Sequence, residues 1–203
     1  MRPQLRALEL GDPPERWEAL GFGVSGGSCP LGGVRLLLGC PGTGITGWTL
    51  SGIAAGTREI DGLRTNAAEE QPLLAAAAHP NGAIAIDHVV VTTANFDRTA
   101  AALGATGMPL RRVAERRDGL RMGFRRLGPA ILELVETKGT QAGRARFWGL
   151  VAVVEDLGAL ADRLGERLGS IRDAVQPGRR IATLRQSAAL GEAVAFMSRE
   201  PGE

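Results

Sequence analysis

The sequence contains no tyrosine, and aromatic residues make up 4% of its 203 positions. Surfaces that bind single-stranded nucleic acid stack bases on aromatic side chains, so we expect no nucleic-acid partner. The net charge of +2 does not imply such a partner either. No apolar run approaches the ~20 residues that span a bilayer, and the first residues lack the apolar core of a signal peptide. We therefore expect a cytoplasmic protein with no membrane partner.

Cysteine and histidine are also scarce, with two of each in the chain. Cys29 and Cys40 have no second pair of cysteine or histidine ligands that would complete a structural zinc site. In a chain without a signal peptide we expect both thiols to be reduced. Of the two histidines, His79 lies in a His-Pro-Asn-Gly turn and His88 lies in an apolar segment.

A repeated order of elements is what the sequence does contain. Residues 83–91 are apolar and β-branched and predict a buried strand. Asn95 or Asp97 stands at the N-cap of a predicted helix that ends near Gly104. Three short strands are predicted to follow, over residues 110–116, 120–127 and 130–135. The segment 83–138 therefore predicts a βαβββ unit.

Residues 146–198 repeat this order. Asp156 is the predicted N-cap of a helix over 157–168, whose apolar residues form one stripe. The predicted strands cover residues 147–154, 171–175, 180–186 and 193–198. Self-similarity over ~50 residues favours an internal repeat, so we expect residues 83–203 to form one domain of two units.

The N-terminal residues 1–57 predict a divergent third βαβββ-like unit, with strands over 5–10, 34–38 and 45–50. Residues 58–82 are rich in Gly, Ala, Glu and Pro and are expected to form a linker. The third unit should pack against the two-unit domain or pair with the same unit of a second chain. An odd number of units leaves a sheet edge or face to cover, which favours a homodimer.

The segments Ile-Asp-His-Val-Val-Val at 86–91 and Ile-Leu-Glu-Leu-Val at 131–135 flank the first predicted unit. With the helix between them, they resemble the first and last strands of the vicinal oxygen chelate superfamily, which includes glyoxalases, bleomycin-resistance proteins and extradiol dioxygenases. The resemblance covers residues 83–198 well and 4–52 loosely. It implies a glyoxalase-like α+β fold, in which tandem βαβββ units form curved mixed sheets around a cleft.

The resemblance also implies a metal-ligand pattern: a His or similar residue from each first strand and a Glu from each last strand. His88 and Glu133 match this pattern in the central unit, whereas the matching positions of the C-terminal unit are Gly149 and Ala195 or Phe196. At most one divalent ion (Fe, Mn, Ni, Zn or Mg) is implied. Two protein ligands would leave four of six octahedral positions to water or substrate.

The residues themselves leave three interpretations of His88 and Glu133 open. Both are polar residues in apolar strands, where a buried carboxylate needs a partner. The pair is a metal site, a metal-free acid–base or ligand-binding pair, or a hydrogen bond without a catalytic role. Histidine titrates near neutral pH and burial raises the pKa of a glutamate, so the pair suits proton transfer.

Arginines gather over residues 98–126 and again over 179–185. Most of them fit solvated strand faces, but an arginine that faces the cleft would clamp a carboxylate or phosphate. Arg180 is the candidate for that substrate-binding role. Trp148 is the candidate aromatic residue of the cleft wall or ligand contact.

Together these patterns predict a glyoxalase-like protein that acts on a small, anionic ligand through His88 and Glu133. The expected reaction is that of a lyase, isomerase or dioxygenase, with or without a divalent metal. One alternative is a non-catalytic small-molecule binding or sequestering protein of the bleomycin-resistance type. The other is a degenerate scaffold whose cleft is filled by its own side chains. A fold of this kind does not identify the substrate or the reaction.

Overall fold

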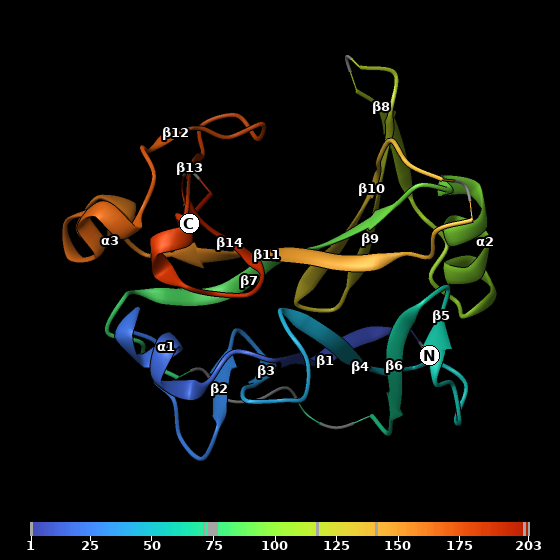
Figure 1. Ribbon diagram of the computed structural model, residues 1–203, viewed down its shortest axis with the longest axis horizontal. Helices are drawn as coiled ribbons and strands as arrows, with labels where there is room; N and C mark the ends of the chain where they lie inside the picture. The colour runs from blue at the N-terminus through green and yellow to red at the C-terminus, as the bar shows by residue number, and fades with distance from the viewer. Residues whose placement is uncertain are drawn as a thin grey trace.

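The chain folds into two stacked β-sheets with short helices against them (Figure 1). The computed structural model describes residues 2–70, 72, 77–116, 118–140, 142–200 and 202. The N-terminal third forms a six-stranded sheet and the remainder forms an eight-stranded sheet. None of the described helices is long and apolar enough to cross a membrane.

The eight-stranded sheet consists of the two predicted βαβββ units. The central unit comprises β7 (Ala83–Thr93), α2 (Phe96–Ala105), β8 (Arg112–Glu115), β9 (Arg121–Leu127) and β10 (Ala130–Glu136). The C-terminal unit comprises β11 (Arg146–Val154), α3 (Leu157–Leu164), β12 (Arg172–Asp173), β13 (Arg180–Thr183) and β14 (Ala193–Ser198). Across the sheet the strand order is β12-β13-β14-β11-β7-β10-β9-β8. The predicted α+β class and the curved mixed sheet are confirmed.

Both helices of the two βαβββ units begin with a side-chain N-cap, as the sequence predicts. The Asn95 side chain accepts a hydrogen bond from the backbone N–H of Arg98 at the start of α2. The Asp156 side chain accepts from two backbone N–H groups at the start of α3. The second helix ends at Leu164 rather than at residue 168, because Gly165 adopts a positive φ of 54° and a 3₁₀ turn follows.

The two units are related by a pseudo-two-fold axis between their first strands. β7 and β11 pair antiparallel, and each pairs parallel with the last strand of its own unit, β10 or β14. The axis makes Gly149 the counterpart of His88, and Ala195 the counterpart of Glu133. The pairings that fix this are Val90 with Gly149, Val151 with His88, Ile131 with His88, Glu133 with Val90, Ala193 with Gly149, and Ala195 with Val151.

The six-stranded sheet repeats the same pairing in a reduced form. Its elements are β1 (Gln4–Leu10), α1 (Pro14–Ala19), β2 (Ser28–Leu31), β3 (Val34–Leu37), β4 (Ile45–Ser51), β5 (Glu59–Ile60) and β6 (Leu63–Ala68). β1 and β4 pair antiparallel at the centre, β1 pairs parallel with β3, and β4 pairs parallel with β6. The strand β4 therefore begins a second reduced unit, whereas the sequence predicts that it ends a single third unit. The described strands of this sheet thus form two reduced units, and the homodimer stays a prediction.

Part of the predicted linker, residues 58–82, is sheet. β5 and β6 occupy residues 59–68 and form a hairpin around Asp61-Gly62. Both turn residues have positive φ, 46° and 95°, which is the geometry of a type I′ turn. Ile60 and Leu63 are buried on either side of the turn. Residues 71 and 73–76 of the predicted linker lie outside the described residues.

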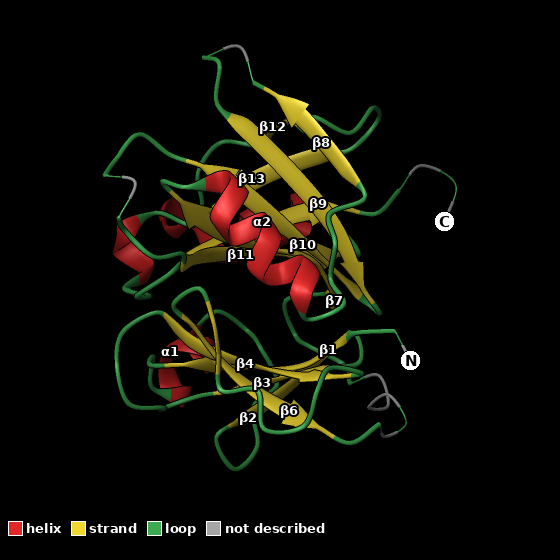
Figure 2. Cartoon of the chain, turned by 90° about the vertical axis from the view of Figure 1, so that its right-hand side faces the viewer, coloured by secondary structure: helices red, strands yellow, loops and turns green. Residues whose placement is uncertain are grey.

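The smaller sheet packs against one face of the larger sheet, beneath β7 and β11 (Figures 1 and 2). Trp48 of β4 is fully buried and meets Phe147 of β11 edge-on, with ring centroids 5.3 Å apart. Phe22 lies 6.0 Å from Phe196 of β14 in a stacked arrangement. Of the two arrangements expected for the N-terminal part, packing against the two-unit domain is the one observed.

His79 belongs to the contact between these two parts of the chain. Its Nδ1 accepts a hydrogen bond from the backbone N–H of Gly23 at 2.9 Å, so Nε2 carries the proton and donates to the Pro30 carbonyl at 2.9 Å. Burial lowers the pKa of His79 and favours this neutral form. This histidine therefore joins the segment before β7 to the N-terminal sheet.

Candidate functional site

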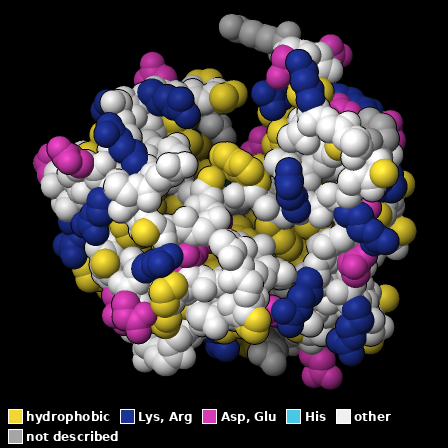
Figure 3. Space-filling model, viewed as in Figure 1, with side chains coloured by type: hydrophobic (Ala, Val, Ile, Leu, Met, Phe, Trp, Pro, Cys, Tyr) yellow, Lys and Arg dark blue, Asp and Glu magenta, His cyan; other side chains and the backbone are white. Residues whose placement is uncertain are grey.

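The larger sheet curves into a trough with β7 and β11 as its floor (Figure 1). A cavity of about 400 Å³ lies in this trough, lined by strands of both units. Hydrophobic side chains are exposed in the hollow between two raised sides (Figure 3). A second hollow of about 440 Å³ adjoins the first, and His88 and Glu133 line both. We call the two together the cleft; its size and mainly apolar lining suit a small molecule.

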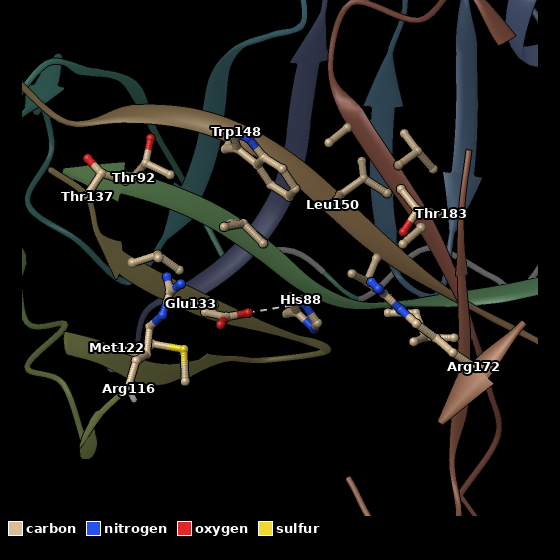
Figure 4. A pocket seen from close by; sticks show the side chains of 17 residues that line it. His88, Thr92, Arg116, Met122, Glu133, Thr137, Trp148, Leu150, Arg172 and Thr183 are labelled. Carbon is tan, nitrogen blue, oxygen red and sulfur yellow. Dashed lines mark ion pairs between the residues drawn. The ribbon is translucent and has the colours of Figure 1, made fainter. Parts of the chain in front are cut away.

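Two paired strands bring His88 and Glu133 together. On β10, Glu133 lies two residues beyond Ile131, the register partner of His88 on β7. Because side chains alternate along a strand, this offset places both on the cleft face. His88 Nε2 lies 3.2 Å from Glu133 Oε2, and the two side chains are 13% and 17% exposed (Figure 4). The two residues selected from the sequence are therefore in contact.

A β-bulge adds a third residue to this pair. Val151 pairs with His88 and Ala152 pairs with Ile86, so Asp87 is left without a partner on β11. Regular alternation would send Asp87 to the opposite face, but a bulge re-aims the side chain of the extra residue. Asp87 Oδ2 lies 2.7 Å from His88 Nδ1. The imidazole is therefore held between two carboxyl groups.

Arg179 completes a row of four side chains. Its Nη1 lies 2.6 Å from Asp87 Oδ1, and its Nε donates to the Ser198 carbonyl at 2.9 Å. The side chain is 5% exposed, so this is a buried ion pair. The row Arg179–Asp87–His88–Glu133 thus runs from the buried edge of the site to the cleft. Neither Asp87 nor Arg179 was predicted as a site residue from the sequence.

The two carboxyl groups differ in their electrostatic surroundings. Burial raises the pKa of Asp87, but the hydrogen bonds and charges of His88 and Arg179 outweigh it, so the net shift is downward. Burial raises the pKa of Glu133, the Asp87 carboxylate adds to this, and His88 and Arg116 oppose it. One carboxyl group is therefore held ionised while the other is tuned toward the pH range of proton transfer.

These shifts fix how protons are arranged along the row. An ionised Asp87 can only accept hydrogen bonds, so His88 Nδ1 must carry a proton and donate it. His88 Nε2 then faces Glu133, so a proton taken up at the Glu133 carboxyl group can be shared with this nitrogen. Since Glu133 lines the cleft, this proton lies next to any bound molecule. The arrangement can accept or deliver a proton at the Glu133 carboxyl group.

The donor atoms do not fit the four-ligand metal pattern that the resemblance implies. His88 and Glu133 supply two donors, but their counterparts Gly149 and Ala195 supply none. A Cβ at Gly149 would lie 2.1 Å from the Ala193 carbonyl oxygen, so no larger residue fits there without backbone movement. Among the described residues, no three His, Cys, Asp or Glu side chains are grouped to hold a metal ion.

The remaining predicted residues divide into one inside the cleft and one outside it. Trp148 lines the cleft and is 56% exposed, at a second bulge where Phe147 pairs with Val91 and Gly149 with Val90. Arg180 is exposed and does not line the cleft.

Strand alternation explains the position of Arg180. Ile181 and Thr183 of β13 line the cleft, so the side chain of Arg180 leaves the strand on the other face. Two other arginines, Arg116 and Arg172, line the cleft instead (Figure 4). The cleft therefore contains arginine, as expected, but at Arg116 and Arg172 and not at Arg180.

Comparison with solved structures supports the fold assignment. The chain is similar to a xylose isomerase-like TIM barrel/4-hydroxyphenylpyruvate dioxygenase fusion protein, with a TM-score of 0.69 and 12% identity over 98% of this chain and 49% of that chain. The match therefore spans about half the length of the fusion protein. The fold is glyoxalase-like, with few helices and curved mixed sheets.

Two shorter matches cover 59% of this chain. Methylmalonyl-CoA epimerase from Mycobacterium tuberculosis matches over 91% of its own chain, with 21% identity and a TM-score of 0.49. A single-residue variant of the Streptomyces coelicolor epimerase, in complex with 2-nitronate-propionyl-CoA, matches over 96% of its chain, with 18% identity and a TM-score of 0.47. No protein-family model and no curated protein matches the sequence.

Proposed function

We propose that this glyoxalase-like chain is a metal-independent proton-transfer enzyme, of the isomerase or lyase type, that acts on a small anionic molecule. The observation that carries the proposal is the contact of buried Glu133 with His88, whose other ring nitrogen is held by Asp87. Glu133 is the catalytic acid–base group. His88 holds the proton that Glu133 gains or loses, and Asp87 and Arg179 position the imidazole.

The row provides what a general base needs. A base acts best when its pKa lies near the working pH, and the pKa of Glu133 is raised by burial. When Glu133 removes a proton from a bound molecule, the proton is shared with His88 Nε2, and the imidazolium that forms is stabilised by ionised Asp87. The same proton can return to a neighbouring atom of the substrate. These two steps move a proton between adjacent atoms on one face of the substrate.

The cleft limits the kind of substrate. The first of its two hollows has a volume of about 400 Å³, at the lower end of small-molecule sites. Met122, Leu150 and Trp148 supply apolar contacts, while Arg116 and Arg172 supply positive charge. A guanidinium suits a carboxylate by bidentate contact. We infer a compact carboxylate with an acidic C–H bond next to a carbonyl group and a short apolar part.

Hydrogen–deuterium exchange tests the proposal without a known product. The protein is incubated in D₂O with pyruvate, 2-oxobutyrate or 2-oxoisovalerate, and loss of the C–H signal next to the keto group is followed by proton NMR. We expect faster exchange than in buffer, and a loss of about 10²–10⁴-fold in Glu133→Gln, the range of general-base catalysis. The rate should rise with pH through a pKa above the ordinary glutamate value, because Glu133 must be ionised to accept the proton.

Glu136→Gln is the matched control, since it removes a carboxylate from the same strand. Glu136 pairs with Arg121 and does not line the cleft, so this variant should keep the exchange rate. Treatment with EDTA should leave the rate unchanged. Equal exchange by Glu133→Gln and the unaltered protein would show that the glutamate is not the base, and loss of exchange with EDTA would contradict metal independence.

Trp148 favours a second candidate, a small-molecule binding protein without catalysis. Its side chain is 56% exposed within the cleft, whereas Trp17 and Trp48 are fully buried. Exposed aromatic side chains of this kind serve as ligand contacts. A binding protein would leave the His88–Glu133 contact as a structural hydrogen bond.

Tryptophan fluorescence separates the two candidates. Because the other two tryptophans are buried, we expect bound carboxylate to change the emission of Trp148 and iodide to quench it selectively. Trp148→Phe should remove both effects. Saturable binding of the same 2-oxo acids without any deuterium exchange would favour the binding protein, and exchange that Glu133→Gln abolishes would favour the enzyme.

A further inference from the structure

A pocket of about 450 Å³ lies away from the cleft, where the start of the chain meets the central unit. Four arginines line it: Arg2 before β1, Arg111 before β8, and Arg125 and Arg126 near the end of β9. Gln4 is the other polar side chain among the described lining residues, none of which is acidic or aromatic. None of these residues lines the cleft. We call this feature the arginine pocket.

The charge of the arginine pocket is not neutralised within the described part of the chain. Arginines elsewhere, such as Arg98, Arg121 and Arg144, form ion pairs with carboxylates. None of the four pocket arginines forms an ion pair within the described ranges. Four guanidinium groups around one hollow repel one another, and an anion among them would relieve that repulsion.

Arg125 is the most constrained of the four. Its Nη atoms reach the carbonyl oxygens of Gly107 and Pro109 at 3.4 and 3.5 Å, which are long hydrogen bonds. Its Nε is buried and lacks a hydrogen-bond partner among the described residues. Burial, together with the charges of Arg111 and Arg2, lowers the pKa of Arg125. The guanidinium is therefore held in place with part of its donor capacity unused.

We propose that the arginine pocket binds a multivalent anion of the phosphate class, such as phosphate, pyrophosphate or the phosphate end of an organic ester. A phosphate group presents several oxygens to planar guanidinium forks and carries the multiple negative charge that several arginines can share. The described lining residues offer no aromatic surface for a base, so recognition rests on the anion itself. Carboxylates with fewer charges would leave more of the repulsion in place.

The position of the pocket gives anion binding a structural consequence. Arg2 precedes the N-terminal sheet, while Arg111, Arg125 and Arg126 belong to the eight-stranded part of the chain. A bound anion bridges the two parts only in the folded chain. Ligands that bind the folded state alone raise the unfolding temperature in proportion to the logarithm of their concentration.

The test compares unfolding temperatures and calorimetric binding at constant ionic strength. Phosphate, pyrophosphate, AMP, citrate and NaCl are titrated into the unaltered protein and into Arg111→Gln/Arg126→Gln. Arg112→Gln is the matched control, because Arg112 is exposed, follows Arg111 directly and does not line the pocket. Arg172→Gln reports on the cleft, where an arginine could also attract phosphate.

We expect pyrophosphate to raise the unfolding temperature, and the double variant to bind it about 100-fold more weakly, at about tenfold for each charged contact removed. Arg112→Gln and Arg172→Gln should bind as the unaltered protein does. Binding of AMP as tight as that of phosphate would support the ester end as the ligand, and tighter binding of the inorganic ions would support a free anion. No thermal shift, an equal shift with citrate or NaCl, or an equal loss in Arg112→Gln or Arg172→Gln would overturn the proposal.

Discussion

Arg179→Met should lower the free energy of unfolding by about 3–5 kcal/mol, the range for removing one partner of a buried ion pair. Arg179 is 5% exposed and its partner Asp87 is 11% exposed, so the substitution leaves a carboxylate in the protein interior with His88 as its remaining partner. Methionine has similar length and fills the space of the arginine stem. The loss should therefore come from the unpaired charge rather than from a cavity.

The double variant Asp87→Asn/Arg179→Met tests this explanation. Removing both charges removes the uncompensated one, so urea denaturation should show the double variant to be more stable than Arg179→Met alone. Arg199→Met is the matched control: Arg199 pairs with Glu155 at 3.2 Å, but both side chains are largely exposed, and such pairs contribute about 0–1 kcal/mol. If Arg179→Met and Arg199→Met cost the same, the buried pair does not hold the site together.

The stabilising effect of the Asp87–Arg179 ion pair should also depend on pH in the acidic range. Because the net effect of its surroundings holds the pKa of Asp87 below the ordinary value, the unfolded chain binds this proton more readily than the folded chain does. The stability that the ionised carboxylate provides is present above the unfolded pKa and is lost as the pH falls through the folded pKa. The difference between the unaltered protein and Arg179→Met should therefore shrink toward low pH.

The order of elements in the larger sheet could be predicted because its four central strands are mainly apolar and each helix has a capping residue. The smaller sheet was harder to predict, for reasons that lie in particular residues. Pro30 stands within β2, and proline is accepted there because β2 is an edge strand. The Asp61-Gly62 turn between two buried residues was a readable hairpin signal, but it lies in a segment whose composition suggests a linker.

The sequence indicates those site residues that stand out by their type. It does not indicate those whose position depends on an irregularity of the backbone. His88 and Glu133 are identifiable as polar residues in apolar strands, and the sheet brings them together. Asp87 stands next to His88, but alternation assigns it to the opposite face, and only the bulge reverses this. The choice between Arg179 and Arg180 depends on where β13 begins, a boundary that periodicity does not fix to one residue.

Glu192→Gln should stabilise the protein at pH 8 and leave it nearly unchanged at pH 4. Burial and the neighbouring Asp12 carboxyl group raise the pKa of Glu192 from 4.5 to about 9. Protonated Glu192 donates a hydrogen bond to the Asp12 carboxyl group, which contributes to this shift. Asp12 in turn accepts from the Gly191 N–H and lies 3.5 Å from Arg16. This contact joins the N-terminal sheet to the loop before β14.

The direction of the effect follows from proton binding. Between pH 4.5 and about 9 the folded chain keeps a proton on Glu192 that the unfolded chain releases, so stability falls as the pH rises through this window. Glutamine keeps the shape without the ionisation. One pKa unit corresponds to about 1.4 kcal/mol, and each kcal/mol shifts Tm by about 2–4 °C in a chain of this size. We expect Glu192→Gln to raise Tm at pH 8 by about 5 °C or more.

Thermal unfolding of both proteins across pH 4–9 measures the effect directly. Glu18→Gln serves as the control, because Glu18 is exposed and should give a curve parallel to that of the unaltered protein. As the pH rises, the Tm of the unaltered protein should fall further below the Tm of Glu192→Gln. Parallel curves would mean that Glu192 ionises in the folded state as it does in water. In that case the contact between Asp12 and Glu192 must open to solvent.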